Sequence, residues 1–139
     1  MEIIQVSSTL NLQKCLDIRR RVFIEEQKVP EEHELADSKN SVSFLAIFEN
    51  KPVGTIRVRF INPNKTKIER LAVLKECRNK GVGRKLLEKA ISFCKEKSVK
   101  GVMMNAQYYL KEYYESFGFK AVGEPFVEAG IKHIEMRLL

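Results

Sequence analysis

Alternating hydrophobic and polar positions mark the middle of the chain as β-structure. Residues 54–61 alternate cleanly, with apolar and polar side chains on opposite faces (Ile56, Val58 and Phe60 against Thr55, Arg57 and Arg59). Residues 42–49 are mostly apolar, as in a strand that is buried on both faces. Residues 68–74 form a third apolar segment, and polar turns at 50–51 and 62–65 separate the three. The pattern therefore predicts three consecutive strands.

Two longer segments follow the period of an α-helix. Apolar positions between residues 81 and 97 recur every three to four residues (Val82, Leu86, Leu87, Ala90, Ile91, Cys94). An earlier helix is predicted over residues 10–28, and its apolar stripe is Leu12, Cys15, Leu16, Val22 and Phe23. Candidate N-caps at residues 7–9 precede this helix, and Pro30 ends it. One long helix thus lies on each side of the three strands in the chain order.

Shorter elements complete the order. Four further strands are predicted at residues 2–6, 99–106, 119–124 and 131–139. Residues 108–117 are predicted as a short helix, and Gly118 suits its left-handed C-terminal cap. The resulting order, βα–βββ–αβ–αββ, predicts a single α+β domain over residues 1–139 with a mixed sheet.

The composition excludes several classes of protein. With 139 residues and 44% hydrophobic side chains, the chain is long enough for one domain with a substantial core. No apolar run approaches the ~18 residues of a membrane span, and the N-terminus lacks the pattern of a signal peptide. Three scattered cysteines argue against a disulfide framework and predict a cytoplasmic protein. Together with two histidines they form no zinc-binding pattern, so no metal cofactor is expected.

Charge is distributed unevenly along the chain, whose net charge is +7. Residues 75–100 hold nine Lys or Arg and three Glu, and residues 25–37 hold six acids and one Lys. A basic segment beside an acidic one is typical of a site that joins a polyanion to a cation. Two independent solvated surfaces are the alternative interpretation.

The strongest local motif is the segment of residues 78–85, between a predicted strand and a predicted helix. The start of a helix carries unpaired N–H groups and a partial positive charge. Gly81 and Gly83 leave room for a phosphate near the backbone, and four cations surround them (Arg78, Lys80, Arg84, Lys85). The segment lacks the GKS or GKT ending of a nucleotide P-loop. It therefore predicts a phosphate site of another kind, with a plain turn before a helix as the alternative.

This succession of motifs resembles the GNAT superfamily of acetyl-CoA-dependent N-acetyltransferases. The segments that carry the resemblance are Leu71-Ala72-Val73, Arg78-x-x-Gly81-x-Gly83 and Tyr114-x-x-x-Gly118-Phe119. Residues 20–27, 105–107 and 130–136 are similar to the ElaA/YjcF-like branch. The resemblance covers nearly the whole chain. It implies a mixed central sheet with helices on both faces, and acetyl-CoA as the cosubstrate.

The resemblance also implies roles for individual residues. Main-chain groups of Leu71 and Val73 are expected to pair with the pantetheine arm, and a backbone N–H there would stabilise the oxyanion. The expected cofactor-binding residues are Leu71, Ala72, Val73, Arg78, Asn79, Lys80, Gly81, Val82, Gly83, Arg84 and Asn105. By its spacing to Gly118 and Phe119, Tyr114 matches the general acid of the family. The residue type suits this role, because a phenol stays protonated at neutral pH and can donate its proton to a thiolate.

The sequence leaves the general base open. Glu69 is the first candidate, because in a regular strand it shares a face with Leu71 and Val73. Glu26, His133 and a chain of water molecules are the alternatives. Each of these side chains could instead have a structural role, as a paired carboxylate or a satisfied strand histidine.

We therefore expect acetyl transfer from acetyl-CoA to a primary amine of a small cationic molecule or of a protein, by direct attack on the thioester. The acidic segment of residues 25–37 would attract cationic acceptors. Three alternatives are a basic nucleic-acid-binding module, a non-catalytic acyl-CoA sensor and a synthase of acyl-homoserine lactones. Few aromatic residues interrupt the basic segment, which argues against nucleic acid. No membrane partner is expected, and the protein is expected to be a monomer or a homodimer.

Overall fold

The elements follow the order that the sequence predicts, and the computed structural model describes them over residues 1–29 and 40–138. They are β1 (Glu2–Gln5), α1 (Thr9–Arg19), the π-helix η1 (Arg20–Glu26), β2 (Ser41–Phe48), β3 (Lys51–Asn62), β4 (Lys65–Val73), the 3₁₀-helix η2 (Lys75–Cys77), α3 (Val82–Glu96), β5 (Gly101–Gln107), the 3₁₀-helix η3 (Tyr108–Leu110), α4 (Lys111–Glu115), β6 (Lys120–Glu128) and β7 (Ile131–Leu138). The expected helix over residues 108–117 is divided, because a 3₁₀ turn precedes its α-helical part. Within the described residues, no helix has both the length and the hydropathy needed to cross a membrane.

A mixed sheet organises the molecule, as predicted. Its strand order is β1-β2-β3-β4-β5-β7-β6. Neighbouring strands are antiparallel, except that β4 and β5 are parallel. Parallel strands need a crossover between them, and α3 supplies it.

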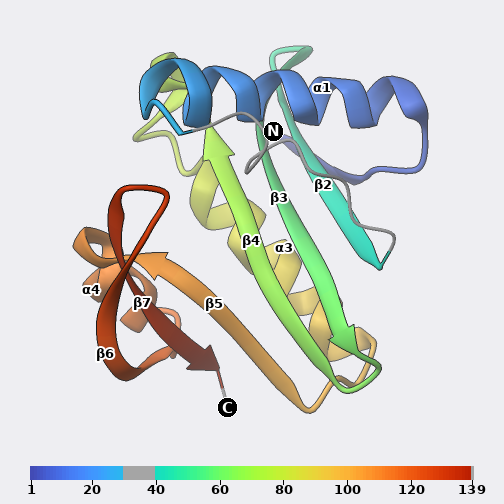
Figure 1. Ribbon diagram of the computed structural model, residues 1–139. Coiled ribbons are helices and arrows are strands. Elements are labelled where there is room, and N and C mark those ends of the chain that lie inside the picture. The colour runs from blue at the N-terminus through green and yellow to red at the C-terminus, as the bar shows by residue number, and fades with distance from the viewer. Residues whose placement is uncertain (30–39, 139) are drawn as a thin grey trace.

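Helices cover both faces of the sheet (Figure 1). On one face, α3 packs through the stripe that the sequence predicts, and Leu86, Leu87 and Ala90 are completely buried against the strands. On the other face, α1 and η1 contribute Cys15, Ile18 and Val22 to a separate core with strand residues. The two cores fix the strands between them, so the sheet is the frame on which the site is built.

The first helix differs from its prediction in type. The predicted helix over residues 10–28 is α-helical only to Arg19, and it continues as a π-helix from Arg20 to Glu26. No sequence signal marked this change. A wider helical turn is often found at functional sites, and here it ends beside the cavity described below.

Arg19 is an unexpected member of the core under α1, because only 1% of it is exposed. Its Nη2 atom donates a hydrogen bond to the Ser43 hydroxyl at 3.0 Å. Burial lowers the pKa of the guanidinium to about 10. The apolar stripe predicted for this helix contained Leu12 and Leu16, which are only half-buried.

Candidate active site

Strands β4 and β5 are paired at one end and separated at the other. Their registered positions are Lys65 with Gly101, Thr66 with Val102, and Lys67 with Met103. Beyond these positions the strands diverge (Figure 1). A cavity of about 750 Å³ lies there, and its walls come from η1, β4, the start of α3, β5, α4 and β7. The separation of the two strands therefore creates the site.

A β-bulge in β4 shapes one wall of this cavity. Arg57 of β3 lies opposite Glu69, but Thr55 lies opposite Ala72, so β4 carries one extra residue between them. Arg70 adopts a left-handed backbone with φ of 58°. The predicted alternation is therefore wrong at this point. Because of the extra residue, Leu71 packs in the core on the α3 side, whereas Glu69 faces the other side with Arg57.

The loop before α3 has the geometry of an anion site. Gly81 occupies the N-cap with φ of 79° and ψ of 10°, and no side chain caps the helix. The first helical hydrogen bond runs from the Lys85 N–H to the Gly81 carbonyl at 3.1 Å. The preceding N–H groups have no helical acceptor. Residues 81–84 line the cavity, so these donors are available to an anionic ligand.

The width of this cradle depends on Gly83. A Cβ atom on Gly83 would lie 3.7 Å from Val73 Cγ2 and 4.0 Å from the Tyr113 hydroxyl. The glycine therefore faces a narrow space between β4 and α4. A larger side chain there would narrow the cavity at the start of α3.

The cations of the loop have separate partners. Arg78 donates its Nε–H to the Val73 carbonyl at 3.0 Å and both terminal nitrogens to the Glu26 carboxylate at 2.6 and 2.7 Å. Arg84 lies over the ring of Phe117, 4.7 Å from its centroid. Lys80 lies over the ring of Phe48 at 5.6 Å and does not line the cavity. Arg78 thus ties η1 to the end of β4.

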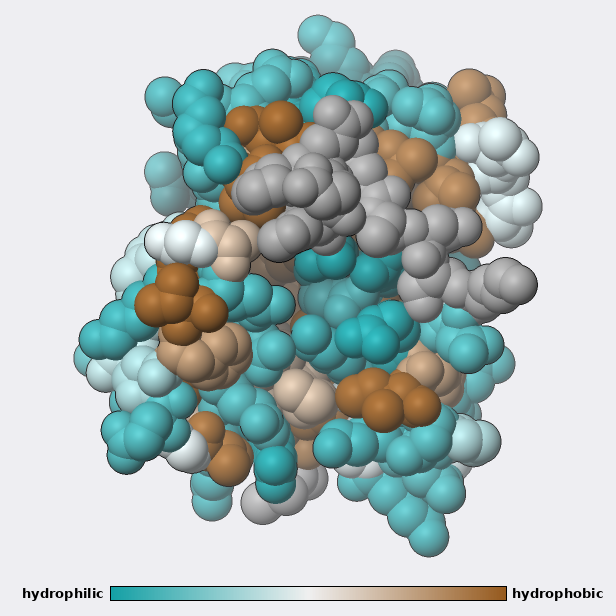
Figure 2. Space-filling model, in the orientation of Figure 1, coloured by the Kyte–Doolittle hydropathy of each residue, from teal (hydrophilic) through white to brown (hydrophobic). Residues whose placement is uncertain are grey.

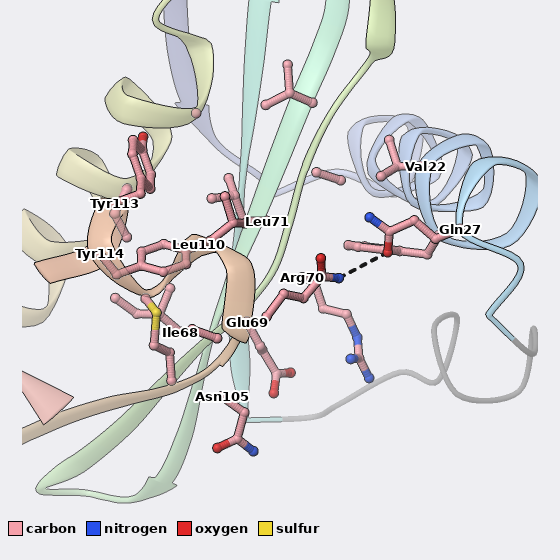
Figure 3. A pocket seen from close by; sticks show the side chains of 18 of the residues that line it. Val22, Gln27, Ile68, Glu69, Arg70, Leu71, Asn105, Leu110, Tyr113 and Tyr114 are labelled. Atoms are coloured by element: carbon pink, nitrogen blue, oxygen red, sulfur yellow. Dashed lines mark hydrogen bonds between the residues drawn. The ribbon is translucent and has the colours of Figure 1, made fainter. Parts of the chain in front are cut away.

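Two tyrosines line the opposite wall, as Figure 3 shows. Tyr114 is buried, and its ring packs edge-to-face against Tyr113 and Phe119 with centroid distances of 5.4 and 6.4 Å. Burial raises the pKa of the Tyr114 phenol above its ordinary value. The Tyr114 hydroxyl is therefore protonated at neutral pH and can act as a proton donor.

Glu69 lies in a dense group of ion pairs on the α1 side of the sheet, where hydrophilic residues gather below α1 (Figure 2). It accepts hydrogen bonds from Arg57 and Arg59, and Lys67 Nζ is 3.8 Å from its Oε1 atom. Only 7% of the Glu69 side chain is exposed. Burial alone would raise the pKa of Glu69, but the Arg57 charge and hydrogen bond hold it below its ordinary value.

Polar side chains from the C-cap of η1, from β5 and from β7 complete the cavity. The Gln107 side chain donates a hydrogen bond to the Gln27 side chain at 3.1 Å, across 80 positions of sequence. His133 is 9% exposed and lines the cavity beside them. Its Nδ1 atom is 2.7 Å from the Ile131 carbonyl oxygen, and its ring stacks on Phe126. The two glutamines were not candidates in the sequence, because no local pattern connects them.

Comparison with known proteins decides the family. The family model of the acetyltransferase (GNAT) domain matches residues 7–139. The chain belongs to the GNAT acetyltransferase family. As a GNAT protein it is an acyl-CoA-dependent acetyltransferase, and this confirms the resemblance seen in the sequence.

Relatives of this GNAT chain agree over its full length. YjcF of Bacillus subtilis (strain 168), an uncharacterized N-acetyltransferase, is 33% identical over 141 residues, which cover 98% of each chain. The crystal structure of Escherichia coli ElaA is 27% identical, with a TM-score of 0.89 and complete coverage of both chains. An acyl-CoA N-acyltransferase from Pseudomonas aeruginosa is 26% identical with a TM-score of 0.84 and also covers both chains completely. The fold and the acyltransferase activity predicted from the sequence are therefore confirmed.

The GNAT cavity brings together nearly all of the residues that the sequence singled out. Tyr114, Glu69 and every expected cofactor-binding residue except Lys80 line it. Asn105 reaches it from β5, below Glu69 in Figure 3. Of the acidic segment, Glu25 and Glu26 lie on η1, and Glu26 lines the cavity. Glu31, Glu32, Glu34 and Asp37 are outside the described residues.

Proposed function

We propose that this protein transfers an acetyl group from acetyl-CoA to a primary amine of a small cationic molecule or of a protein. The observation that carries the proposal is one continuous cavity, which joins the uncapped start of α3 to Tyr114 between two separated strands. An anionic cosubstrate with a long arm fits this shape. Its phosphates would bind at one end, and its thioester would lie between the strands beside a proton donor.

The donor end is formed mainly by the backbone. The N–H groups at the start of α3 would bind the diphosphate, together with Asn79 and with Arg78, which has two of its five N–H donors left. Main-chain groups of residues 71–73 would pair with the pantetheine arm, because the pairing of β4 with β5 ends at Lys67 and no described strand pairs with residues 71–73 on that side. Asn105 lines the cavity from β5, near Glu69, and would contact the cosubstrate or order a water molecule.

The transfer step follows from this arrangement. The neutral amine attacks the thioester carbon, a C–N bond forms, and the C–S bond breaks when the oxyanion collapses. The departing thiolate takes the proton of the Tyr114 hydroxyl, and the phenolate recovers a proton from the acylated nitrogen. A backbone N–H of β4 would stabilise the oxyanion.

The cationic nature of the acceptor rests on the sequence. Six carboxylates within residues 25–37 would raise the local concentration of cationic amines. Glu26, one of these residues, is at the cavity but is paired with Arg78. The three unpaired cysteines at positions 15, 77 and 94 support a cytoplasmic location, and a monomer or a homodimer would serve this chemistry equally.

The proposal is tested by thermal unfolding followed by a transfer assay. Acetyl-CoA at 100 times its Kd should stabilise the protein by about 2.7 kcal/mol. Release of free coenzyme A is then measured with polyamines, lysine peptides and free amino acids. Faster release with cationic amines is expected. Stabilisation without release on any amine would instead indicate an acyl-CoA sensor, and stabilisation by RNA or DNA alone would indicate a nucleic-acid-binding module.

A further inference from the structure

The tautomer of His133 is fixed by the backbone of its own strand. The Nδ1 atom is 2.7 Å from the carbonyl oxygen of Ile131. A carbonyl oxygen only accepts hydrogen bonds, so Nδ1 carries the hydrogen of the neutral ring. The lone pair is then on Nε2, the other ring nitrogen. Stacking on Phe126, with ring centroids 6.0 Å apart and planes at 23°, fixes the ring orientation.

His133 also lines the cavity where the two central strands separate. It pairs in register with Gln107 at the end of β5, where that strand has separated from β4. Both residues line the cavity that contains Tyr114. The charged side chains that line the same cavity are Glu26 on η1, Lys67, Glu69 and Arg70 on β4, Arg78 before α3, Arg84 on α3 and Glu128 on β6. Its other titratable side chains, besides His133, are Cys77, Tyr109, Tyr113 and Tyr114.

The carboxylates in this cavity with known partners are poor proton acceptors. Glu69 is held by Arg57 and Arg59, and Glu26 is held by both terminal nitrogens of Arg78. Arginine partners stabilise the ionised carboxylate, and a stabilised carboxylate binds a proton less well. In contrast, the lone pair of the His133 ring is not used by its bond to Ile131.

We propose that His133, through Nε2, is the general base that deprotonates the acceptor amine. This inference rests on the proposed N-acetyltransferase function. The acceptor enters as an ammonium and gives one proton to Nε2, directly or through a water molecule, which leaves a neutral amine and an imidazolium. The neutral amine then attacks the thioester as described above. A second proton leaves the acylated nitrogen and reprotonates the Tyr114 phenolate, whose own proton has gone to the departing thiolate. The imidazolium of His133 returns its proton to solvent.

The tautomer is tested without any assay of activity. The protein has two histidines, so ¹⁵N-detected NMR of the parent and of His133→Gln assigns the ring of His133. We expect a protonated Nδ1 and an unprotonated Nε2 in the neutral ring. A hydrogen on Nε2 would overturn the proposal, because that nitrogen could not then accept a proton.

The catalytic role is tested with two amines of similar size and different basicity. Ethylamine is an ammonium at pH 7, as an alkylamine of pKa about 10 must be, whereas 2,2,2-trifluoroethylamine is largely neutral there. The variant is His133→Asn, whose side-chain amide can keep the bond to the Ile131 carbonyl but has no basic nitrogen. We expect kcat/KM for ethylamine to fall about 10²-fold or more, and that for the fluorinated amine to change less than about fivefold.

Equal losses on both amines in folded His133→Asn would give His133 a structural role and overturn the proposal. Unchanged kinetics of His133→Asn on both amines would mean that another group is the general base, and this result would overturn the proposal as well. If the parent binds acetyl-CoA but acetylates no amine, the proposed function itself fails. The NMR result distinguishes that case, because it reports on the ring of His133 alone.

Discussion

The two ends of the cavity are built in different ways. Apart from Asn105, the proposed donor end comes from one stretch of chain, residues 71–84, and most of its groups are backbone N–H and carbonyl groups. The proposed acceptor end takes single side chains from the C-cap of η1 and from β4, β5 and β7, namely Gln27, Glu69, Gln107 and His133. Each of these four depends on the exact register of its strand or on the pitch of its helix.

This difference shows which part of the site a sequence can reveal. A glycine-containing turn before an amphipathic helix is a local feature, so it can be recognised wherever it occurs. A hydrogen bond between Gln27 and Gln107 exists only after the whole sheet has formed. We therefore expect substitutions at the donor end to change mainly cosubstrate affinity, and those near the acceptor end to change turnover or stability.

The largest expected effect is on turnover, from Tyr114→Phe. The change removes one hydroxyl from a buried ring that packs against Tyr113 and Phe119, so the packing should be kept. Without the proton donor, kcat should fall by about 10²–10⁴-fold while the Kd of acetyl-CoA stays within about twofold. Steady-state kinetics and calorimetry measure the two quantities.

Tyr113→Phe is the matched control, because its hydroxyl lies on the Gly83 side of the cavity. We expect its kcat to stay within about threefold of the parent. A larger loss in Tyr113→Phe than in Tyr114→Phe would exchange the two roles.

Glu69→Gln should act mainly on stability and should show a characteristic dependence on pH. The carboxylate and Arg57 are 7% and 6% exposed, so removing its charge breaks a buried ion pair at a cost of about 3 kcal/mol. The pKa of Glu69 is lowered in the folded protein, so its stabilising effect is complete above the unfolded pKa and disappears as pH falls through the folded value.

Urea unfolding of the parent and of Glu69→Gln, at pH 7 and in steps toward pH 3, measures this effect. The difference in free energy of unfolding should shrink as the pH falls. A difference that is independent of pH would show that the ion pairs of Glu69 do not stabilise the fold.

The sequence predicted the frame of the molecule well, and it singled out Glu69 and His133 but not Gln27 and Gln107 at the proposed acceptor end. Strong periodicity identified α3 and the strands, because a helix or strand that buries one face must repeat its apolar positions. The bulge at Arg70 was not predictable, since arginine has no preference for a positive φ and the apolar pattern continues across it. That single residue places Glu69 and Leu71 on opposite faces of the sheet. The reason for choosing Glu69 as the general base, a face shared with Leu71 and Val73, is therefore wrong.

The π-helical turn after Arg19 escaped prediction for a related reason. The same apolar residues suit an α-helix and a π-helix over two turns, and only the packing under η1 distinguishes them. Arg19 itself was missed because an arginine is rarely buried unless it is paired. Its partner, Ser43, is on a strand 24 residues away.

Gly83→Val tests the proposed donor end, and its expected effect on acetyl-CoA affinity is of intermediate size. A valine side chain would extend from a position already 3.7 Å from Val73 Cγ2 into the space expected to hold a phosphate. The Kd of acetyl-CoA should rise by about 10–100-fold, or roughly 1.4–2.7 kcal/mol, while the fold survives. Gly101→Val is the matched control at the paired end of β5, because its Cβ would also have ordinary contacts, at 3.7 Å from Lys65. Equal affinities of Gly83→Val and Gly101→Val for acetyl-CoA would show that the diphosphate does not bind at this loop.

The smallest expected effect is a change in acetyl-CoA affinity in Glu26→Gln, because Glu26 is the partner of Arg78. Arg78 connects η1, at the proposed acceptor end, to the end of β4, at the proposed donor end. Its Nε–H and its terminal nitrogens are bonded to the Val73 carbonyl and to Glu26, whose pKa the Arg78 hydrogen bond lowers. In Glu26→Gln the arginine loses a competing anion and can turn more fully toward the diphosphate. Acetyl-CoA should bind about two- to threefold more tightly at low salt, and the gain should disappear at high salt, because partly exposed charges are screened. The gain in affinity should also vanish as the pH falls through the lowered pKa of Glu26, since the parent then loses its carboxylate charge too.

Calorimetric titration at two salt concentrations measures the Kd of acetyl-CoA for the parent and for Glu26→Gln. Weaker binding by Glu26→Gln at low salt would mean that Arg78 only connects η1 to β4 and does not bind the diphosphate.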